Sequence, residues 1–302
     1  MSVFDPLGLV STIVIHGKII MQTIWKTGIY WDDPVPPAVF ADWQRWVNAL
    51  KKLDVIEIPR CYFPDYDPVS YNNLELHVFV DASESAYACV AYFRIIDRGL
   101  VRCSLVSSKS KVAPVKSLSI PRLELQAAVI GTRLAKTISE NHSLQIRRRV
   151  FWSDSSTVLA WIRSDHRRYK QYVAFRISEI LSESTIAEWR WVPTKQNVAD
   201  EATKWGKGSE YNQASRWFSA PSFLYNTEEN WPNQGSNTSE TTEELRVVHN
   251  LHRNNTMNSV IDFSRFSKFE RLVRAAAHVH QFFTICLDRR NQGTSLNSVL
   301  SN

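Results

Sequence analysis

The stretch Leu76–Ser83, LHVFVDAS, decides the fold of this 302-residue chain. Apolar side chains occupy every second position in and before it, and Glu75, His77 and Phe79 lie between Leu74, Leu76, Val78 and Val80. Successive side chains of a strand point to opposite faces, so this alternation predicts a β-strand over residues 74–81. Because the strand ends at Asp81, one carboxylate is expected at the edge of a sheet.

Three further acidic stretches follow in a fixed order. IPRLELQAA (120–128) carries Glu124, FWSDSSTVLAWI (151–162) carries Asp154, and WVPTKQNVADEATK (191–204) carries Asp200. Each acid falls where a strand ends or a helix begins, and each taken singly could be an ordinary turn or capping residue. Four carboxylates gathered from separate elements would repel one another unless they held cations. Oxygen ligands of this kind suit Mg²⁺.

The pattern between these stretches predicts an α/β domain over residues 71–207. Strands are expected over 74–81, 86–96 and 100–107, joined by short turns into an antiparallel meander. A helix then begins at Pro121, and its predicted buried stripe is Leu123, Ala127, Ile130, Leu134 and Ile138. A strand at 148–152, helices at 155–163 and 172–182, a strand at 188–192 and a helix at 198–204 complete the order βββαβαβα.

The flanking sequence predicts three further segments. Residues 1–70 are expected to form a separate unit with helices at 10–25 and 40–53. Residues 208–258 are expected to be a flexible linker, because the stretch from Thr227 onward is rich in Asn, Thr, Ser and Glu. Residues 259–302 regain helical character from Phe263 to Leu287.

The acidic stretches resemble the ribonuclease H fold, a mixed five-stranded sheet with the order just described. Several long stretches narrow the resemblance to the Pol polyprotein of BEL/Pao long-terminal-repeat retrotransposons. These are FDPLGLVSTIVIHGKIIMQTIW (4–25), KSKVAPVKSLSIPRLELQAAVIGTRL (109–134), FWSDSSTVLAWI (151–162) and DFSRFSKFERLVRAAAHV (262–279). The resemblance implies that the first segment is a reverse-transcriptase thumb or connection, and that the last precedes an integrase. We therefore expect a piece of a polyprotein whose partners include those two parts.

The same resemblance implies a chemistry for the acids. Asp81, Glu124, Asp154 and Asp200 would be catalytic residues that bind two Mg²⁺ or Mn²⁺ ions, and the substrate would be the RNA strand of an RNA–DNA hybrid. Many ribonuclease H enzymes carry a histidine in the loop before the last acid, and residues 193–197 contain none. The alternative is an inactive remnant that binds nucleic acid without cleaving it.

Basic residues flank the acids in sequence and predict contacts to phosphates. They are Lys109, Lys111, Lys116 and Arg122 before the second acid, and Arg163, Arg167, Arg168 and Lys170 after the third. Tyr169 and Tyr172 lie among the second group and could stack on bases or sugars. The formal charge of +6 permits a nucleic-acid partner without requiring one, and a solvated basic face is the alternative.

Other function classes find little support in the sequence. Tyr30-Trp31-Asp32-Asp33 matches a polymerase string but runs into Pro34-Val35-Pro36-Pro37, which cannot form the second strand of a hairpin. Retroviral-type aspartic peptidases need a glycine after Asp-Thr or Asp-Ser, and neither Asp81-Ala82-Ser83 nor Asp154-Ser155-Ser156 has one. Four dispersed cysteines, no zinc-finger spacing and no signal or membrane segment predict an intracellular protein.

Overall fold

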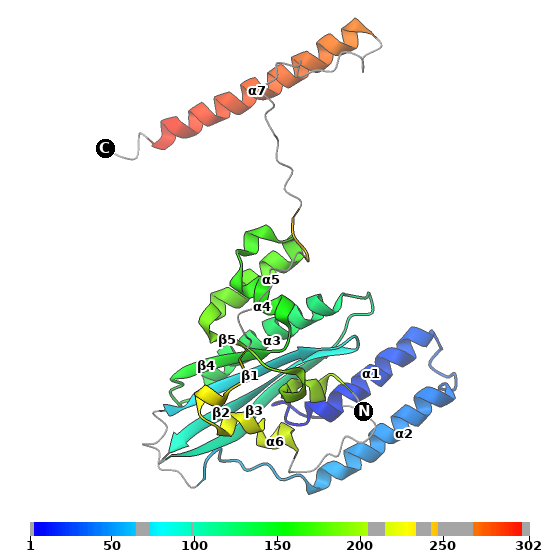
Figure 1. Ribbon diagram of the computed structural model, residues 1–302. Helices are drawn as coiled ribbons and strands as arrows, with labels where there is room; N and C mark the ends of the chain where they lie inside the picture. Colours follow the sequence, from blue (N-terminus) through cyan, green and yellow to red (C-terminus); the bar gives the residue numbers. More distant parts are fainter. Residues whose placement is uncertain are drawn as a thin grey trace. The chain divides into compact units, whose positions relative to one another are not determined.

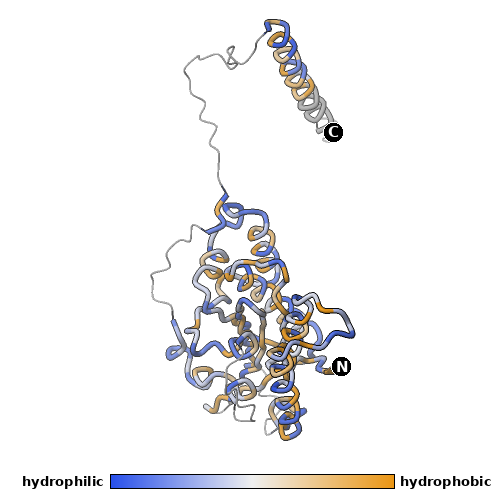
Figure 2. Tube along the Cα trace, turned by 90° about the vertical axis from the view of Figure 1, so that its right-hand side faces the viewer, coloured by the Kyte–Doolittle hydropathy of each residue, from blue (hydrophilic) through white to orange (hydrophobic). Residues whose placement is uncertain are grey.

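The computed structural model describes residues 3–64, 73–97, 99–204, 215–233, 243–246 and 268–297. Residues 1–247 form one compact unit and residues 248–302 a second. In the second unit the described element is helix α7 (Phe269–Asn297), and the coloured part of this helix in Figure 2 carries both hydrophobic and hydrophilic residues. None of the helices described is long and apolar enough to cross a membrane.

A five-stranded mixed sheet forms the centre of the first unit, with the strand order β3-β2-β1-β4-β5 (Figure 1). Its strands are β1 (Glu75–Ala82), β2 (Ala86–Asp97), β3 (Leu100–Val112), β4 (Arg148–Ser153) and β5 (Trp189–Trp191). The first three pair antiparallel, whereas β1, β4 and β5 run parallel. The predicted fold class and element order are therefore confirmed, although the last predicted helix is a 3₁₀ turn, η6 (Val198–Ala202).

One face of the sheet is covered by α3 (Ile120–Asn141), α4 (Ser156–Arg163) and α5 (Gln171–Glu183). Their apolar side chains pack with Leu76, Val78 and Val80, the even-numbered residues of β1. All five residues of the predicted α3 stripe are buried. The helix approaches β1 closely at Gly131, where an added Cβ would come within 2.6 Å of Val80 Cγ1.

The opposite face is covered by a segment that the sequence predicted to be linker. Residues 215–233 form α6 (Arg216–Ser219), η7 (Ser222–Tyr225) and η8 (Glu228–Asn230). Trp217, Phe223, Leu224 and Trp231 from this segment are buried against Phe79, Tyr92 and Trp152 of the sheet. The linker prediction is wrong for residues 215–233. It rests on the polar average composition of the region, and four large apolar side chains do not stand out in that average. The remainder of residues 208–258, apart from 243–246, lies outside the described residues.

The main chain of this segment is also tied to the sheet. Tyr92 Oη donates to the carbonyl of Trp217 at 2.6 Å. The buried Arg94 guanidinium donates to the carbonyls of Leu224 at 2.7 Å and Asn226 at 3.1 Å. These bonds satisfy polar groups that would otherwise be buried without partners, so the segment is an integral layer of the unit.

The amino-terminal helices belong to the same compact unit, which differs from the predicted boundary at residue 70. Helices α1 (Ser11–Thr27) and α2 (Pro37–Lys51) pack on each other, and Trp46 Nε1 donates to Ile13 O at 2.9 Å. The residues before α1 then join the sheet. Leu7 O accepts a hydrogen bond from Ser108 N of β3 at 2.9 Å. Gly8 follows with a φ of +73° against the Ser108 carbonyl.

Candidate active site

Asp81 and Asp154 lie side by side at the carboxyl ends of two neighbouring parallel strands. The register pairs Val80 of β1 with Ser153 of β4, and the two acids are the next residues of each chain segment. Residues in parallel register point to the same face of a sheet. The first and third predicted acids therefore meet where β1 and β4 end, beside the covering layer that contains η6.

Asp81 is almost completely buried, with 4% of its surface exposed. Its Oδ2 accepts a hydrogen bond from Thr203 Oγ1, just after η6. Burial, together with the negative charges of Asp154 and Asp200, raises the pKa of Asp81 to about 7 against the opposing effects of Thr203 and Lys204. Asp81 thus lies within electrostatic reach of two of the other predicted acids.

Glu124 approaches the same edge from the other face of the sheet. It lies in the first turns of α3, and its Oε2 accepts a hydrogen bond from Ser155 Oγ at 2.5 Å, directly after Asp154. Burial raises the pKa of Glu124, and the charges of Asp154 and Glu243 add to the effect while Ser155 opposes it. Asp154 therefore acts electrostatically on both Asp81 and Glu124.

Asn197 connects the elements that carry these acids. It is fully buried, and its Nδ2 donates to Val80 O at 3.0 Å and to Asp154 Oδ1 at 3.1 Å. Its Oδ1 accepts from Ala199 N at 3.3 Å, which caps η6. Sequence reasoning inspected this loop only for a histidine and missed Asn197. The available signal was an asparagine at a helix start, although its partners 43 and 117 residues away were not visible.

Asp200, the fourth acid, forms an ion pair with Lys204 four residues later. Burial acts to lower the pKa of Lys204, but the bond to Asp200 and the nearby negative charges together outweigh it, so the pKa is raised. The charges of Asp81 and Asp154 contribute to the rise, which shows that the ammonium is close to both. One positive side chain therefore faces three of the four acids. The sequence analysis missed Lys204 as well as Thr203, although the spacing of four between Asp200 and Lys204 is an ordinary helical pair.

A metal site requires several ligand side chains of suitable chemistry close together. Across the part of the chain that the structure describes, no three His, Cys, Asp or Glu side chains are grouped closely enough to hold an ion. The donor set nevertheless fits Mg²⁺ or Mn²⁺, since four carboxylates supply only hard oxygen ligands and the charge of Asp154 helps to raise the pKa of both Asp81 and Glu124. Lys204 offsets part of that charge.

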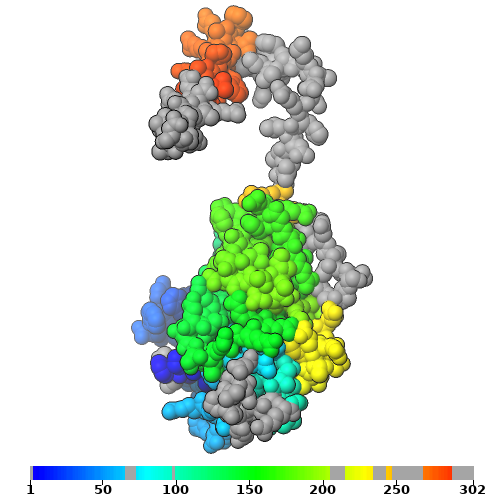
Figure 3. All heavy atoms as spheres, turned by 90° about the vertical axis from the view of Figure 1, so that its left-hand side faces the viewer, coloured from blue at the N-terminus to red at the C-terminus, as the bar shows by residue number. Residues whose placement is uncertain are grey.

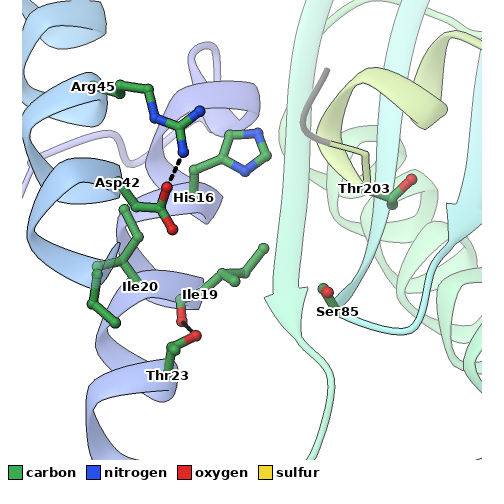
Figure 4. A pocket seen from close by; sticks show the side chains of 9 residues that line it. His16, Ile19, Ile20, Thr23, Asp42, Arg45, Ser85 and Thr203 are labelled. Atoms are coloured by element: carbon green, nitrogen blue, oxygen red, sulfur yellow. Dashed lines mark hydrogen bonds and ion pairs between the residues drawn. The ribbon is translucent and has the colours of Figure 1, made fainter. Parts of the chain in front are cut away.

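A pocket of about 350 Å³ lies between the α1–α2 pair and this end of the sheet (Figure 4). Thr203, which bonds Asp81, lines it together with Ser85 of the β1–β2 turn, and His16 and Arg45 face them from the helices. Burial lowers the pKa of His16 to about 4, which keeps this ring neutral near neutral pH. The amino-terminal helices therefore border the acidic edge.

The predicted basic residues divide into two groups. Arg122 on α3 and Lys170 before α5 both form ion pairs with Glu244. The other six are exposed, on β3, before α3, at the end of α4 and in η3 (His166–Arg168): Lys109, Lys111, Lys116, Arg163, Arg167 and Arg168.

The two tyrosines differ in accessibility. Tyr169 is 2% exposed and cannot stack on a nucleotide, contrary to expectation, because its ring packs against Trp161 in the core. Tyr172 is only half-buried, and its ring is flanked by Arg122 at 4.8 Å and Arg176 at 3.5 Å. Arg176 was missed, since nothing in the sequence marks it as the partner of an aromatic ring four residues earlier.

Comparison with family models identifies the family of the chain. A family model described as the Pao retrotransposon-like RNaseH-like domain matches residues 1–155, and the chain belongs to this family. The match includes α1 and α2 as well as Asp81, Glu124 and Asp154. This agrees with the joint folding of the amino-terminal helices and the sheet. No curated protein matches the chain.

Several solved ribonuclease H structures are similar at low identity. The amino-terminal RNase H domain of a Mycobacterium tuberculosis protein is 11% identical, covers 41% of this chain and 86% of its own, and gives a TM-score of 0.31. LC11-RNase H1, solved in complex with an RNA/DNA hybrid, is 10% identical with 43% and 93% coverage and a TM-score of 0.30. RNase H1 from Halobacterium salinarum is 10% identical with 42% and 89% coverage and a TM-score of 0.26.

Proposed function

We propose that this chain is a ribonuclease H that hydrolyses the RNA strand of RNA–DNA hybrids at Asp81, Glu124, Asp154 and Asp200. The observation that carries the proposal is the electrostatic coupling of these acids. Asp154 acts on both Asp81 and Glu124, and Asp200 acts on Asp81, although the four come from different elements. A fold gains nothing in stability from gathering like charges, so their convergence favours a function that uses them.

Each carboxylate has a neighbour that fixes its position. Thr203 holds Asp81, Ser155 holds Glu124, Asn197 holds Asp154 and Lys204 holds Asp200. Such support orients oxygen atoms before a substrate arrives. Two Mg²⁺ or Mn²⁺ ions, when bound by these oxygens, would supply activation of a water molecule and stabilisation of the leaving 3′ oxygen.

The remaining residues would bind the substrate. Arg122, Arg176 and Tyr172 form a basic and aromatic surface beside Glu124 on α3, suited to a sugar–phosphate backbone. The exposed Lys109 and Lys111 of β3 pair with Cys89 and Tyr87 of β2. Ala88, which lies between these two β2 residues, pairs with Asp81, so both lysines are close in register to this acid. Discrimination of RNA from DNA would depend on the 2′-hydroxyl. Reverse-transcriptase and integrase parts of one polyprotein are the proposed protein partners.

A second candidate is a nucleic-acid-binding remnant without activity. The observation that favours it is Lys204, whose ammonium already faces three of the acids; in addition, the residues described include no group of three carboxylates that could hold a metal ion. In that case the basic surface would be kept and the acids would serve only the fold.

Cleavage of a labelled RNA–DNA hybrid separates the two candidates. The chain is incubated with hybrid in Mg²⁺ or Mn²⁺, beside Asp81→Asn and the matched control Asp54→Asn, an exposed residue of η1 (Lys52–Val55). We expect metal-dependent cleavage of the RNA strand that Asp81→Asn abolishes and Asp54→Asn retains. A folded chain that binds the hybrid and never cleaves it would leave the remnant as the correct description.

A further inference from the structure

Residues 243–246 lie across the junction between η3 and α5, although this junction is distant from them in the sequence. Lys170 N donates to Glu244 O at 2.7 Å, and Arg246 N donates to Arg168 O at 2.8 Å. Tyr169 and Leu245 form an antiparallel bridge, and the Leu245 side chain packs against the main core. In Figure 3 these residues, coloured gold, rest directly on the green surface of the sheet unit.

The carboxylate of Glu244 is placed in a basic site. Its Oε1 accepts hydrogen bonds from Arg122 Nε at 2.8 Å and lies 2.7 Å from a terminal nitrogen of the same guanidinium. The Lys170 ammonium lies 3.6 Å from the other oxygen, Oε2. Only 15% of this glutamate side chain is exposed. An anion is therefore held by two of the residues predicted to contact phosphates.

Two features show that this contact is not optimised for stability. Glu244 has a φ of +60°, a left-handed conformation that side chains other than glycine adopt at a cost. Its Oε2 is buried and accepts no hydrogen bond, because its ion-pair partner, the Lys170 ammonium at 3.6 Å, is too distant to donate one. A buried acceptor without a donor is unfavourable and calls for an explanation outside packing. Such a contact is explained if Arg122 and Lys170 release Glu244 when they bind another anion during function.

The site lies beside the acids. Arg122 is two residues before Glu124 on α3, and its guanidinium also lies over the Tyr172 ring. Glu243, the neighbour of Glu244, is close enough for its charge to act on Glu124. The basic surface proposed above to receive a sugar–phosphate backbone is thus partly covered by an acidic segment of the same chain.

We propose that Glu244 occupies the seat of a backbone phosphate in the free protein, and that residues 243–246 must leave Arg122 and Lys170 before an RNA–DNA hybrid binds. Guanidinium groups bind carboxylates and phosphates through the same donors, so the two anions compete for one site. This inference rests on the proposed function, because it takes the hybrid as the competing ligand. The apparent affinity for the hybrid is then the intrinsic affinity multiplied by the fraction of molecules in which the segment has left the site.

Binding of a fluorescent RNA–DNA hybrid in EDTA tests the competition without cleavage. The full chain is compared with Glu244→Gln and with Glu228→Gln. The control removes the same charge from a glutamate paired with Arg148 and Arg190, at the opposite end of β4 from Asp154. Glu244→Gln should bind about fivefold more tightly, the ratio that one partly exposed ion pair supports. Glu228→Gln should match the wild type. Equal or weaker binding by Glu244→Gln, or an equal gain from Glu228→Gln, would overturn the inference.

Hydrogen exchange of the wild type gives a second measurement that does not depend on how a variant folds. The amides of Lys170 and Arg246 are bonded only while the segment is in place, so saturation with hybrid should speed their exchange. Unchanged protection in the saturated complex would refute displacement while leaving hybrid cleavage intact. If no form of the chain binds or cleaves hybrid, the proposed function itself fails, and this inference fails with it.

Discussion

Replacing Asp81 with asparagine should stabilise the cation-free protein while removing its proposed activity. The side chain is buried, and its pKa rises from 3.8 to about 7, first because of burial and then because of Asp154 and Asp200. A displacement of that size corresponds to about 4 kcal/mol for the ionised form. Asparagine has nearly the same shape, can still accept from Thr203 and carries no charge, so the variant avoids this cost.

The pH dependence follows from which state holds the proton. The unfolded chain releases the Asp81 proton near pH 3.8, whereas the folded chain keeps it up to about pH 7. Between these values the folded state binds more protons, and wild-type stability therefore falls as the pH rises. Relative to Asp81→Asn, the wild type should lose about 1.4 kcal/mol per pH unit across this window. The difference should vanish below pH 4 and stay constant above 7.

Thermal unfolding in EDTA at pH 4 and pH 8 measures this difference, with Asp54→Asn as the control for a surface charge. At pH 8 the midpoint of thermal unfolding should be roughly 10 °C higher for Asp81→Asn, at about 2–4 °C per kcal/mol for a domain of this size. Added Mg²⁺ should narrow the gap, because the cation favours the ionised wild-type acid. A variant that is equal to or less stable than the wild type at pH 8 in EDTA would refute the electrostatic reasoning.

Two further predictions concern the segments that flank the sheet. Gly8→Ala should lower the free energy of unfolding by about 1–3 kcal/mol, because an added Cβ would lie 2.0 Å from the Ser108 carbonyl at a φ of +73°; a denaturation curve that overlays the wild type would contradict the close approach. Trp231→Ala should cost about 3–5 kcal/mol, since the ring is 6% exposed and packs on Trp152 with a centroid separation of 5.6 Å. Chemical denaturation would show no change if this part of the chain were linker.

The sequence predicted the sheet well because each of its elements carries a complete local pattern. The alternation through Val78 and Val80 marked β1, and the spacing of Leu123, Ala127 and Ile130 marked the buried face of α3. Neither inference needs knowledge of distant residues. The proximity of Asp81 and Asp154 follows from the same elements, since parallel strands β1 and β4 bring both residues to one edge.

The partners of the acids were beyond such reasoning, because they depend on contacts between distant segments. Asn197 reaches Val80 across 117 residues, and Thr203 reaches Asp81 across 122. Composition was misleading for residues 215–233, where a few buried aromatic side chains outweigh a polar background. An average hydropathy over a window estimates how much apolar surface a segment can bury. A single buried tryptophan such as Trp217 is enough to anchor the segment to the sheet.

The hydrogen bond from Ser108 to Leu7 protects one edge of the sheet. β3 is an outer strand of the sheet, and an uncovered outer strand offers its amides and carbonyls to any other chain. Residues 7–11 shield it at Ser107 and Ser108, and Gly8 lets the backbone come close enough to do so. A protein trimmed to residues 71–207 would expose this strand as well as the face that Trp217 and Trp231 cover. Such a fragment would tend to self-associate, so the smallest soluble unit should include both flanks.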